Sequence, residues 1–394
     1  MKGSQRKNSK FEIGMLVTNR GFDDPRVCME AETLVQAGYS VAVIGWDRDA
    51  NEDSECQQAG VRFIRLCLRS THGRGLIQLL FLTGFWLRAW CVLRHLRPKV
   101  IHCHDLDTLV IGWLVSWFQG SRLVFDAHEN FPDMMVGHLP AAAVWAMECL
   151  EACLVPRSRF VITVGERLAR HFRRMRARKV IIVGNWKNPK DFFFPPGRIR
   201  EARRNLGLDD GIITICYITN LGPRRRLEPL LAAVARNPRF ACVIGGTGPQ
   251  APLAKQYAEG YKNIIYLGQV PRERVALITA SCDLVYSGYD ERGPDARWAA
   301  PNKMHEAIAA GKPLLTNDFG EIGEVIRQHN CGILVETATR EGIASGLESI
   351  TRSALEAMGR RSASLQGHFY RAHGPGQLRE AYCETLGYRE LPGE

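Results

Sequence analysis

Short runs of β-branched and aromatic residues alternate with longer amphipathic stretches along almost the whole chain of 394 residues. This repeated order of strand and helix is typical of parallel sheets joined by helical crossovers. The strands expected in the first half are 13–17, 41–45, 63–66, 100–103, 123–125, 160–164 and 180–183. Those expected in the second half are 213–218, 241–244, 264–267, 284–286, 314–316 and 333–335. The sequence therefore predicts an α/β protein.

The alternation breaks once, at residues 185–200, which are rich in proline and phenylalanine. Such a break between two similar series predicts a linker between domains. We expect two doubly wound domains, residues 1–190 and 198–368. Ligands of open α/β sheets bind at the carboxyl ends of the strands, so we expect the domains to face each other across a cleft.

Composition excludes several classes of protein. With 45% hydrophobic and 24% charged residues, the chain is neither collagen-like nor disordered. No uncharged stretch reaches the ~18 residues of a membrane-spanning helix, and the first apolar run, 13–17, is too short for a signal-peptide core. The twelve cysteines form no Cys-x-x-Cys pair, so we expect reduced thiols without disulfides or zinc. A cytoplasmic protein is the expectation.

The net charge of +11 is concentrated in one segment. Residues 157–204 hold fifteen Lys and Arg against three acids, a net charge of +12, so the rest of the chain sums to −1. Such a segment can bind an anionic lipid surface or a polyphosphate, although a solvated helix surface is the alternative. We expect no nucleic acid, because no recognition module accompanies the charge.

Two predicted helices raise the question of membrane contact. Residues 75–96 hold four Phe or Trp side chains and have arginines near the far end, as in interfacial helices. The alternative is a helix that covers a parallel sheet. Residues 166–179 have a narrow apolar stripe, Leu168, Phe172 and Met175, beneath six arginines, and this helix could lie weakly on an anionic surface.

The most informative segment runs from Pro301 to Pro313. Its first proline and its closing Gly311-Lys312-Pro313 bracket one short helix. The N-terminus of that helix could bind a phosphate without a metal. Glu306 lies about a turn and a half along it, placed to accept two hydrogen bonds from a vicinal diol such as a ribose.

This segment, with seven others, resembles glycosyltransferase family 4, a retaining family with the GT-B fold of two Rossmann-like domains. The other segments are 24–27, 30–34, 37–39, 102–105, 126–129, 183–185 and 245–249. Their order and spacing extend the resemblance over roughly residues 11–350. It implies that 1–190 bind the acceptor, that 198–368 bind a nucleotide sugar, and that a helix at about 370–394 packs back onto the first domain.

On the nucleotide side, the resemblance assigns Glu306 to the ribose and Arg225 to the diphosphate. Arginine forks match phosphate oxygens, and Arg225 lies in a loop with Arg224 and Arg226. Glycines in the nucleotide-binding domain would allow the donor to approach the backbone closely. The further residues expected in this nucleotide-sugar site are Gly222, Gly246, Gly248, Asn302 and Lys303.

On the acceptor side, His128 follows the predicted strand 123–125, where the family has a histidine that touches the donor sugar and is needed for transfer. A structural histidine is the alternative. With Glu306 and Arg225, His128 is a candidate catalytic residue. The other residues expected on the acceptor side are Gly21, Asp24, Arg26, His104 and Asp105.

We predict no metal and no cofactor. Two Asp-x-Asp triplets, 47–49 and 105–107, resemble the metal-binding triplet of a different glycosyltransferase fold, but both lie in the first domain. His102 and His104 could suggest a metal, but we expect them to point to opposite faces of their strand. No full dinucleotide fingerprint follows the first strand, which disfavours a nicotinamide enzyme.

Two departures from the family pattern keep alternatives open. Trp298 stands where a glutamate commonly contacts the donor sugar, and Asn220 stands where an arginine is common; Asp290, Glu291 or Asp295 could substitute. The expected function is retaining glycosyl transfer (hexosyltransferase type) from a UDP sugar, or next a GDP sugar, to a glycan or lipid-linked acceptor. The alternatives are a nucleotide-sugar 2-epimerase of the same fold and a non-catalytic partner subunit.

Overall fold

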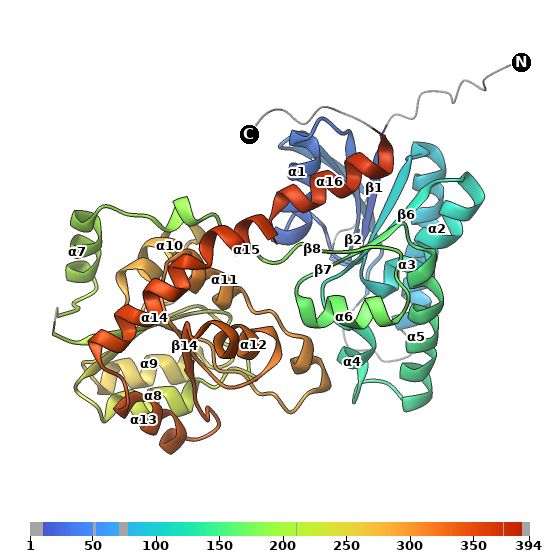
Figure 1. Ribbon diagram of the computed structural model, residues 1–394. Coiled ribbons are helices and arrows are strands. Elements are labelled where there is room, and N and C mark those ends of the chain that lie inside the picture. Colours follow the sequence, from blue (N-terminus) through green and yellow to red (C-terminus); the bar gives the residue numbers. More distant parts are fainter. Residues whose placement is uncertain (1–10, 50–52, 71–77, 210, 373, 388–394) are drawn as a thin grey trace, which may run out of the picture. The chain divides into compact units, whose positions relative to one another are not determined.

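The computed structural model describes residues 11–49, 53–70, 78–209, 211–372 and 374–387. It divides into two α/β units, each built on its own sheet (Figure 1). Unit 1 comprises residues 1–184 and 373–394, and unit 2 comprises residues 185–372. The prediction of two doubly wound, Rossmann-like domains is confirmed.

Unit 1 contains an eight-stranded sheet in the order β3-β4-β2-β1-β5-β6-β7-β8. Its strands are β1 (Ile13–Val17), β2 (Val41–Asp47), β3 (Ser54–Gln58), β4 (Val61–Cys67), β5 (Val100–His104), β6 (Arg122–Ala127), β7 (Phe160–Thr163) and β8 (Val180–Ile182). All neighbours pair in parallel except β3 and β4, which are antiparallel. The central strands are buried along their whole length, because helices cover both faces.

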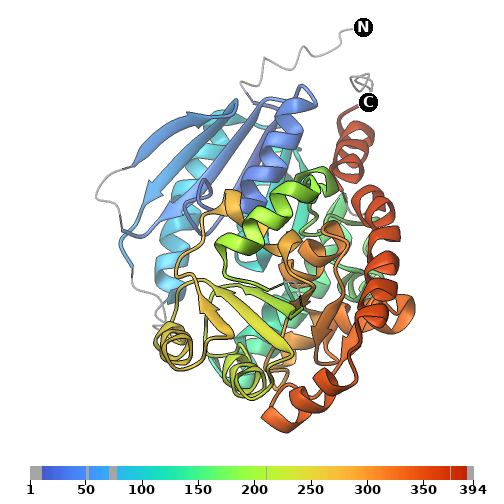
Figure 2. The same ribbon diagram turned by 90° about the vertical axis from the view of Figure 1, so that its left-hand side faces the viewer.

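Helices cover the two faces of this sheet in two groups. They are α1 (Pro25–Gln36), α2 (Gln78–Leu96), α3 (Asp105–Gln119), α4 (Phe131–Met135), α5 (Ala141–Leu154), the 3-10 helix η2 (Val155–Arg157), α6 (Glu166–Arg174) and α16 (Pro375–Leu386). In Figure 1, α2, α3 and α5 lie on the side of the sheet opposite to α1 and α16. Figure 2 shows α1, in blue, across the strands, with α16, in red, next to it.

Local sequence sets where several of these helices begin and end. The carboxylate of Asp24 accepts hydrogen bonds from the backbone N–H groups of Arg26 and Val27, and Pro25 occupies the first helical position of α1. Gly120 ends α3 in the left-handed conformation. The cap at Asp24 holds Arg26 in the first turn of α1, close to the carboxyl edge of the sheet.

Unit 2 contains a six-stranded, all-parallel sheet in the order β11-β10-β9-β12-β13-β14. Its strands are β9 (Ile213–Ile218), β10 (Phe240–Gly245), β11 (Ile264–Tyr266), β12 (Leu284–Tyr286), β13 (Leu314–Thr316) and β14 (Gly332–Leu334). Its α-helices are α7 (Pro196–Asn205), α8 (Leu227–Ala235), α9 (Ala251–Gly260), α10 (Arg272–Ser281), α11 (Asn302–Ala309), α12 (Gly320–His329), α13 (Arg340–Glu348), α14 (Arg352–Ser364) and α15 (Gln366–Ala372), and its 3-10 helices are η3 (Pro189–Phe192) and η4 (Pro294–Trp298).

Apolar side chains pack on both faces of the second sheet, as a doubly wound unit requires. Along β9, Ile215 and Tyr217 belong to one buried cluster, while Cys216 and Ile218 belong to the cluster on the other face. The rings of Tyr217 and Tyr286 meet edge to face at 4.9 Å.

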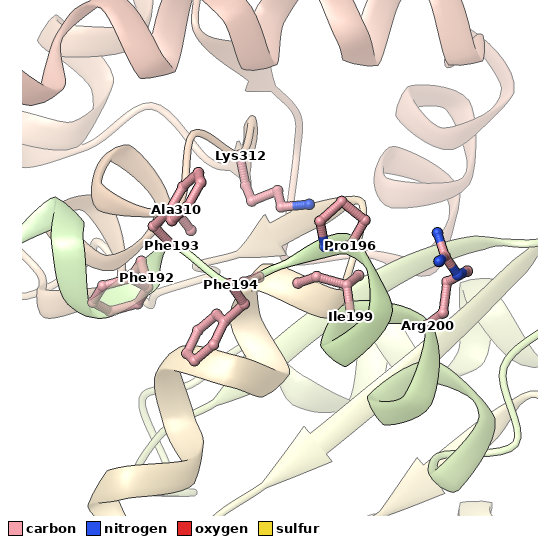
Figure 3. A pocket seen from close by; sticks show the side chains of 9 residues that line it. Phe192, Phe193, Phe194, Pro196, Ile199, Arg200, Ala310 and Lys312 are labelled. Carbon is pink, nitrogen blue, oxygen red and sulfur yellow. The ribbon is translucent and has the colours of Figure 1, made fainter.

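The predicted linker is largely built into unit 2. The unit boundary lies between Gly184 and Asn185, and the chain then forms η3 and begins α7 at Pro196. Phe192 is buried, whereas Phe193 is 81% exposed. Figure 3 shows these rings beside Lys312 in a pocket of about 390 Å³, which contains none of the predicted site residues.

Two elements differ from the sequence-based predictions for identifiable reasons. The helix predicted at 166–179 ends at Arg174, because Arg176 turns to φ +62° and the N–H of Ala177 bonds back to the carbonyl of Phe172. β3 was missed because it is a polar edge strand. The start predicted at residue 75 lies outside the described residues; α2 is described from Gln78.

Candidate active site

Each sheet reverses its strand order once, and the predicted site residues gather near these two places. The reversal lies between β1 and β5 in unit 1 and between β9 and β12 in unit 2. The predicted acceptor-side residues and His128 all belong to unit 1. Arg225, Glu306 and the other predicted nucleotide-sugar residues all belong to unit 2.

Asp126, buried near the end of β6, organises the group in unit 1. Its carboxylate receives two hydrogen bonds from Arg26, at 3.1 Å from Nε and 2.6 Å from Nη2. Its Oδ2 also lies 3.0 Å from His104 Nδ1 and 2.9 Å from His128 Nε2. One carboxylate thus positions three of the predicted residues, and Arg26 reaches Glu30 Oε1 at 3.1 Å as well.

The charges of this group shift one another's pKa values. Burial alone would raise the pKa of Asp126, but Arg26 and His128 hold it well below its ordinary value. Burial alone would lower the pKa of His128, but Asp105 and Asp126 raise it to about 9. His128 is therefore an imidazolium at neutral pH, and it can donate but not accept hydrogen bonds.

Asp24 and Asp105 both interact electrostatically with His128. Asp105 Oδ1 accepts the backbone N–H of His128 at 3.2 Å, and its Oδ2 lies 3.7 Å from His128 Nδ1. Burial alone would raise the pKa of Asp24, but this pKa is lowered, chiefly by the charge of His128. Gly21 has φ +74°, and an added Cβ would come within 2.9 Å of Val43, so a turn requires this glycine.

The expectation that His102 and His104 point to opposite faces was wrong, because residues two apart in a strand share a face. Their rings stack with centroids 4.4 Å apart. His102 Nδ1 lies 2.7 Å from the hydroxyl of Tyr382 in α16, and its Nε2 lies 3.6 Å from Glu30. His102 therefore connects the C-terminal helix to the group around Asp126.

The ligand atoms of Glu30, His102, His104 and Asp126 lie within 4.8 Å of one another, a spacing that could suit a metal ion. Arg26, however, already donates two hydrogen bonds to Asp126 and lies 3.1 Å from Glu30 Oε1. A divalent cation would have to displace a buried guanidinium that balances the same charge. The residues present therefore do not fit a metal ion.

In unit 2, three consecutive arginines have different surroundings. Arg224 Nη1 lies 2.7 Å from Asp295, and Arg226 Nη2 lies 3.1 Å from Asp290. Arg225 has no carboxylate partner among the described residues. Its backbone forms a bridge with Tyr289, and its guanidinium lies 5.0 Å from the centre of that ring. The loop thus holds one cation in place without neutralising it.

The start of α11 supplies further polar groups. Lys303 Nζ donates to the carboxylate of Glu306, and both side chains are largely buried. Lys187 faces the charges of Glu306, Arg272 and Lys303, and burial lowers its pKa. Sequence reasoning missed Lys187. With Asn302 at the first helical position, this region is rich in cations at a helix N-terminus.

Gly246 and Gly248 are needed for a tight approach between loops. Gly246 has φ +130°, and an added Cβ would lie 1.8 Å from the carbonyl oxygen of Thr219. Gly248 has φ +140°, and its Cβ would lie 2.8 Å from the carbonyl oxygen of Leu221. The close approach is thus to the chain's own β9 loop, whereas at Gly222 a Cβ would meet only an ordinary contact.

The three acids suggested as substitutes near Trp298 all have partners within unit 2. Asp295 pairs with Arg224, and Asp290 pairs with Arg226 and Arg292. Glu291 accepts a hydrogen bond of 2.7 Å from Asn317. These acids shape the loop between β12 and α11.

Family comparisons agree with this division of the chain. Residues 24–186 match the model of the glycosyl transferase 4-like domain, and residues 198–363 match the glycosyl transferases group 1 model. The chain is a family 4-type glycosyltransferase with the GT-B fold. Over 338 residues, 81% of this chain and 82% of the relative, it is 25% identical to an uncharacterized glycosyltransferase of Methanocaldococcus jannaschii.

Solved structures share the fold of this glycosyltransferase. Sucrose-phosphate synthase from Thermosynechococcus elongatus matches with a TM-score of 0.74 at 16% identity, covering 95% of this chain and 98% of that chain. The Anabaena protein HepE, in complex with UDP-glucose, matches with a TM-score of 0.67 at 16% identity, covering 95% and 99%.

In unit 1 of this glycosyltransferase, four site residues were not among the predicted ones: Glu30, His102, Asp126 and Tyr382. Two signals pointed to them. Glu30 lies one helical turn after Arg26, and His102 lies two residues before His104. The contact with Tyr382 joins residues 280 positions apart, and no local pattern predicts it.

Proposed function

We propose that this glycosyltransferase moves a sugar, with retention of anomeric configuration, from a nucleoside diphosphate sugar bound by unit 2 to an acceptor bound by unit 1. The observation that carries the proposal is Arg225, a cation held by Tyr289 without a carboxylate partner among the described residues. UDP is the proposed base, with GDP next; the complex of the Anabaena protein with UDP-glucose supports this order.

The departing diphosphate needs positive charge, and unit 2 offers it without a metal. Arg225 lies in the loop after β9, and α11 begins in the loop after the neighbouring strand β12. Both loops are at the carboxyl edge of the sheet, where the dipole of α11 adds to the charge of Lys303. In this proposal the carboxylate of Glu306 accepts hydrogen bonds from the two ribose hydroxyls, in place of its present partner Lys303.

We propose front-face displacement for the transfer. The acceptor oxygen forms its bond to the anomeric carbon on the face from which the diphosphate oxygen leaves, and the acceptor proton passes to that departing phosphate oxygen. His128 lies beside the transferring sugar and donates a hydrogen bond to it as an imidazolium. Asp126 and Asp105 keep His128 protonated and oriented.

The acceptor in this proposal is a glycan or a lipid-linked saccharide of cell-surface polysaccharide or glycolipid synthesis, at the cytoplasmic face of a membrane. The cationic segment 157–204 supports contact with an anionic surface. In the structure, Leu168 and Phe172 of α6 are buried within unit 1, so α6 offers that surface its arginines but not its apolar stripe.

Binding calorimetry with UDP, GDP, ADP and CMP, each with and without EDTA, tests the nucleotide site. One diphosphate should bind regardless of EDTA, and Arg225→Ala should weaken it by about 10- to 100-fold, the loss of a charge-assisted hydrogen bond. The matched control is Arg292→Ala. Arg292 is an exposed arginine in the loop after β12 that pairs with Asp290, so this variant should bind the nucleotide as the wild type does.

Product analysis with the nucleotide sugar that binds tests the reaction. Transfer with the anomeric configuration of the donor supports the proposal. Conversion of the sugar without an acceptor indicates the 2-epimerase, and absence of binding to all four nucleotides indicates the non-catalytic partner.

A further inference from the structure

Unit 1 exposes an unusual concentration of large apolar side chains. Among the described residues, eleven large apolar side chains are exposed, and nine of them lie between Leu79 and Leu150. Six of these form what we call the apolar face: Leu80 and Leu87 on α2, Trp117 and Phe118 on α3, and Trp145 and Leu150 on α5. Leu87 is 71% exposed and Trp145 is 66% exposed.

The three helices of the apolar face are neighbours. α3 packs against α2 on one side and against α5 on the other, and Figure 1 shows the three on one side of the sheet. The rings of Trp90 in α2 and Phe118 in α3 meet edge to face at 5.2 Å. The exposed residues therefore belong to one continuous layer.

The fold of unit 1 does not account for these exposed residues. α2 covers the sheet with a separate buried stripe, Phe85, Ala89, Leu93 and Leu96. Residues 108–119 of α3 contain no charge, and α5 contains only two acids, of which Glu151 is buried. The outer side of a helix that meets only water is normally charged or polar.

Three exposed arginines lie at the end of the sheet where these helices stop. The adjacent strands β5, β6 and β7 begin at or directly after Lys99, Arg122 and Arg159, respectively. The N–H of Arg122 bonds to the carbonyl of Lys99, and the N–H of Arg159 bonds to the carbonyl of Leu123. Arg97 follows α2. Arg97, Arg122 and Arg159 are exposed and have no carboxylate partner among the described residues. Trp117 and Phe118 lie in the last turn of α3, toward the same edge.

We propose that the apolar face and these three arginines dock unit 1 on a lipid bilayer that contains anionic headgroups. Trp and Leu side chains enter the boundary between headgroups and acyl chains, while the guanidinium groups contact lipid phosphates. A second copy of the chain fits less well, because a two-fold contact through this face would bring the arginines of both copies together. This proposal goes beyond glycosyl transfer and needs no nucleotide sugar.

The proposed docking is on the membrane and not across it. By length and composition alone, α2 is long and apolar enough to span a bilayer. Its inner stripe, however, packs in the core of unit 1, where Phe85 stacks on Trp46 of β2 at 5.5 Å. Only the outer side of α2 is available to lipid.

Flotation of the full chain with vesicles tests the docking, without nucleotide or acceptor. The vesicles contain phosphatidylcholine alone or phosphatidylcholine with phosphatidylglycerol. We expect binding to the anionic vesicles that weakens with salt. Because each arginine near an anionic surface contributes about 5-fold, the triple change Arg97→Gln, Arg122→Gln and Arg159→Gln should weaken binding on the order of a hundredfold.

Matched variants separate this surface from other sources of binding. Leu87→Glu with Trp145→Glu should abolish binding, whereas Phe193→Glu, at a more exposed apolar residue of unit 2, should not. Arg198→Gln, Arg200→Gln and Arg204→Gln change three exposed arginines of segment 157–204 that lie on α7 of unit 2, and should have a small effect. Circular dichroism checks that each variant is folded.

Three outcomes would overturn the proposal: no binding of the wild type to anionic vesicles, equal binding of the wild type and the Leu87 and Trp145 variant, or a dimer in solution that this variant disrupts. Nucleotide binding is measured separately, so failure of the docking does not decide the proposed transfer, and failure of the transfer does not decide the docking.

Discussion

The two units share one architecture but build their ligand edges by different means. In unit 1 the edge is organised by buried charged side chains, with Asp126 bonded to Arg26, His104 and His128. In unit 2 it is organised by backbone geometry and by partly exposed ion pairs, with glycines in tight loops and with Arg224 and Arg226 paired to Asp295 and Asp290. The same topology thus supports a rigid polar centre and a cationic loop.

This difference predicts what each unit tolerates. A buried ionic group depends on every partner, because removing one leaves an uncompensated charge away from water. A surface ion pair is screened by solvent and contributes little. Unit 1 should therefore be sensitive to changes of side-chain charge, and unit 2 to changes of backbone freedom.

The largest expected effect is that of Asp126→Asn. The substitution leaves the buried guanidinium of Arg26 beside Glu30, whose carboxyl is mostly neutral at pH 7 because its pKa is raised to about 8, so we expect the free energy of unfolding of unit 1 to fall by about 3–5 kcal/mol. Urea denaturation measures it. Asp290→Asn, which breaks partly exposed ion pairs with Arg226 and Arg292 in unit 2, should cost no more than about 1 kcal/mol. Equal losses of stability in the two variants would contradict the expectation that unit 1 is more sensitive than unit 2 to changes of side-chain charge.

Gly246→Ala should be the corresponding destabilising substitution in unit 2. An added Cβ would collide with the carbonyl of Thr219, and φ is +130°, so we expect a loss of about 1–3 kcal/mol from backbone strain, with weaker nucleotide binding. Gly260→Ala is the control, because nothing lies within 4 Å of an added Cβ there. If both variants unfold at the same urea concentration, backbone geometry is not what unit 2 depends on.

Glu30→Gln should change how stability depends on pH. Burial, followed by Asp126, raises the pKa of Glu30 from 4.5 to about 8 in the folded chain. The stabilisation from its neutral carboxyl is complete below about pH 4.5 and is lost as the pH rises through 8, with a slope of up to about 1.4 kcal/mol per pH unit. An amide carries no such proton, so the variant should lose less stability between pH 6 and pH 9.

Denaturation at several pH values checks this, with Glu32→Gln in the same helix as the control. His128, whose pKa is raised to about 9, contributes a loss of the same sign in both variants, so the difference between them reports Glu30. Identical pH profiles for the wild type and Glu30→Gln would contradict the expected neutral carboxyl.

The smallest expected effect is that of Tyr382→Phe. It removes the hydroxyl partner of His102 without opening a cavity, so we expect a loss of about 0.5–1.5 kcal/mol. Hydrogen exchange should show the loss in α16. Tyr261→Phe, at an exposed ring of unit 2, should leave exchange unchanged. Unchanged exchange in Tyr382→Phe would mean that packing alone holds α16 on unit 1.

Local sequence determined most elements of this protein. Strands 13–17, 213–218, 284–286 and 314–316 were predicted with the bounds that the structure has, because their apolar runs lie between clear helix and turn signals. The short helix between Pro301 and Gly311 was bracketed for the same reason. β3 was not predicted, because the sequence of this exposed edge strand contains no apolar run.

The sequence by itself therefore determined the α/β fold, the family and the residues that collect at the strand ends, since these depend on short-range periodicity and on motifs. Only the tertiary structure decided which charges meet. It joined Tyr382 to His102 and made Asp126 the common partner of three side chains. Among the described residues, it also left Arg225 without a carboxylate partner between two paired neighbours. Hydrogen bonds and ion pairs act over a few ångströms in space, and the order of strands in a sheet, not distance along the chain, determines which groups come that close.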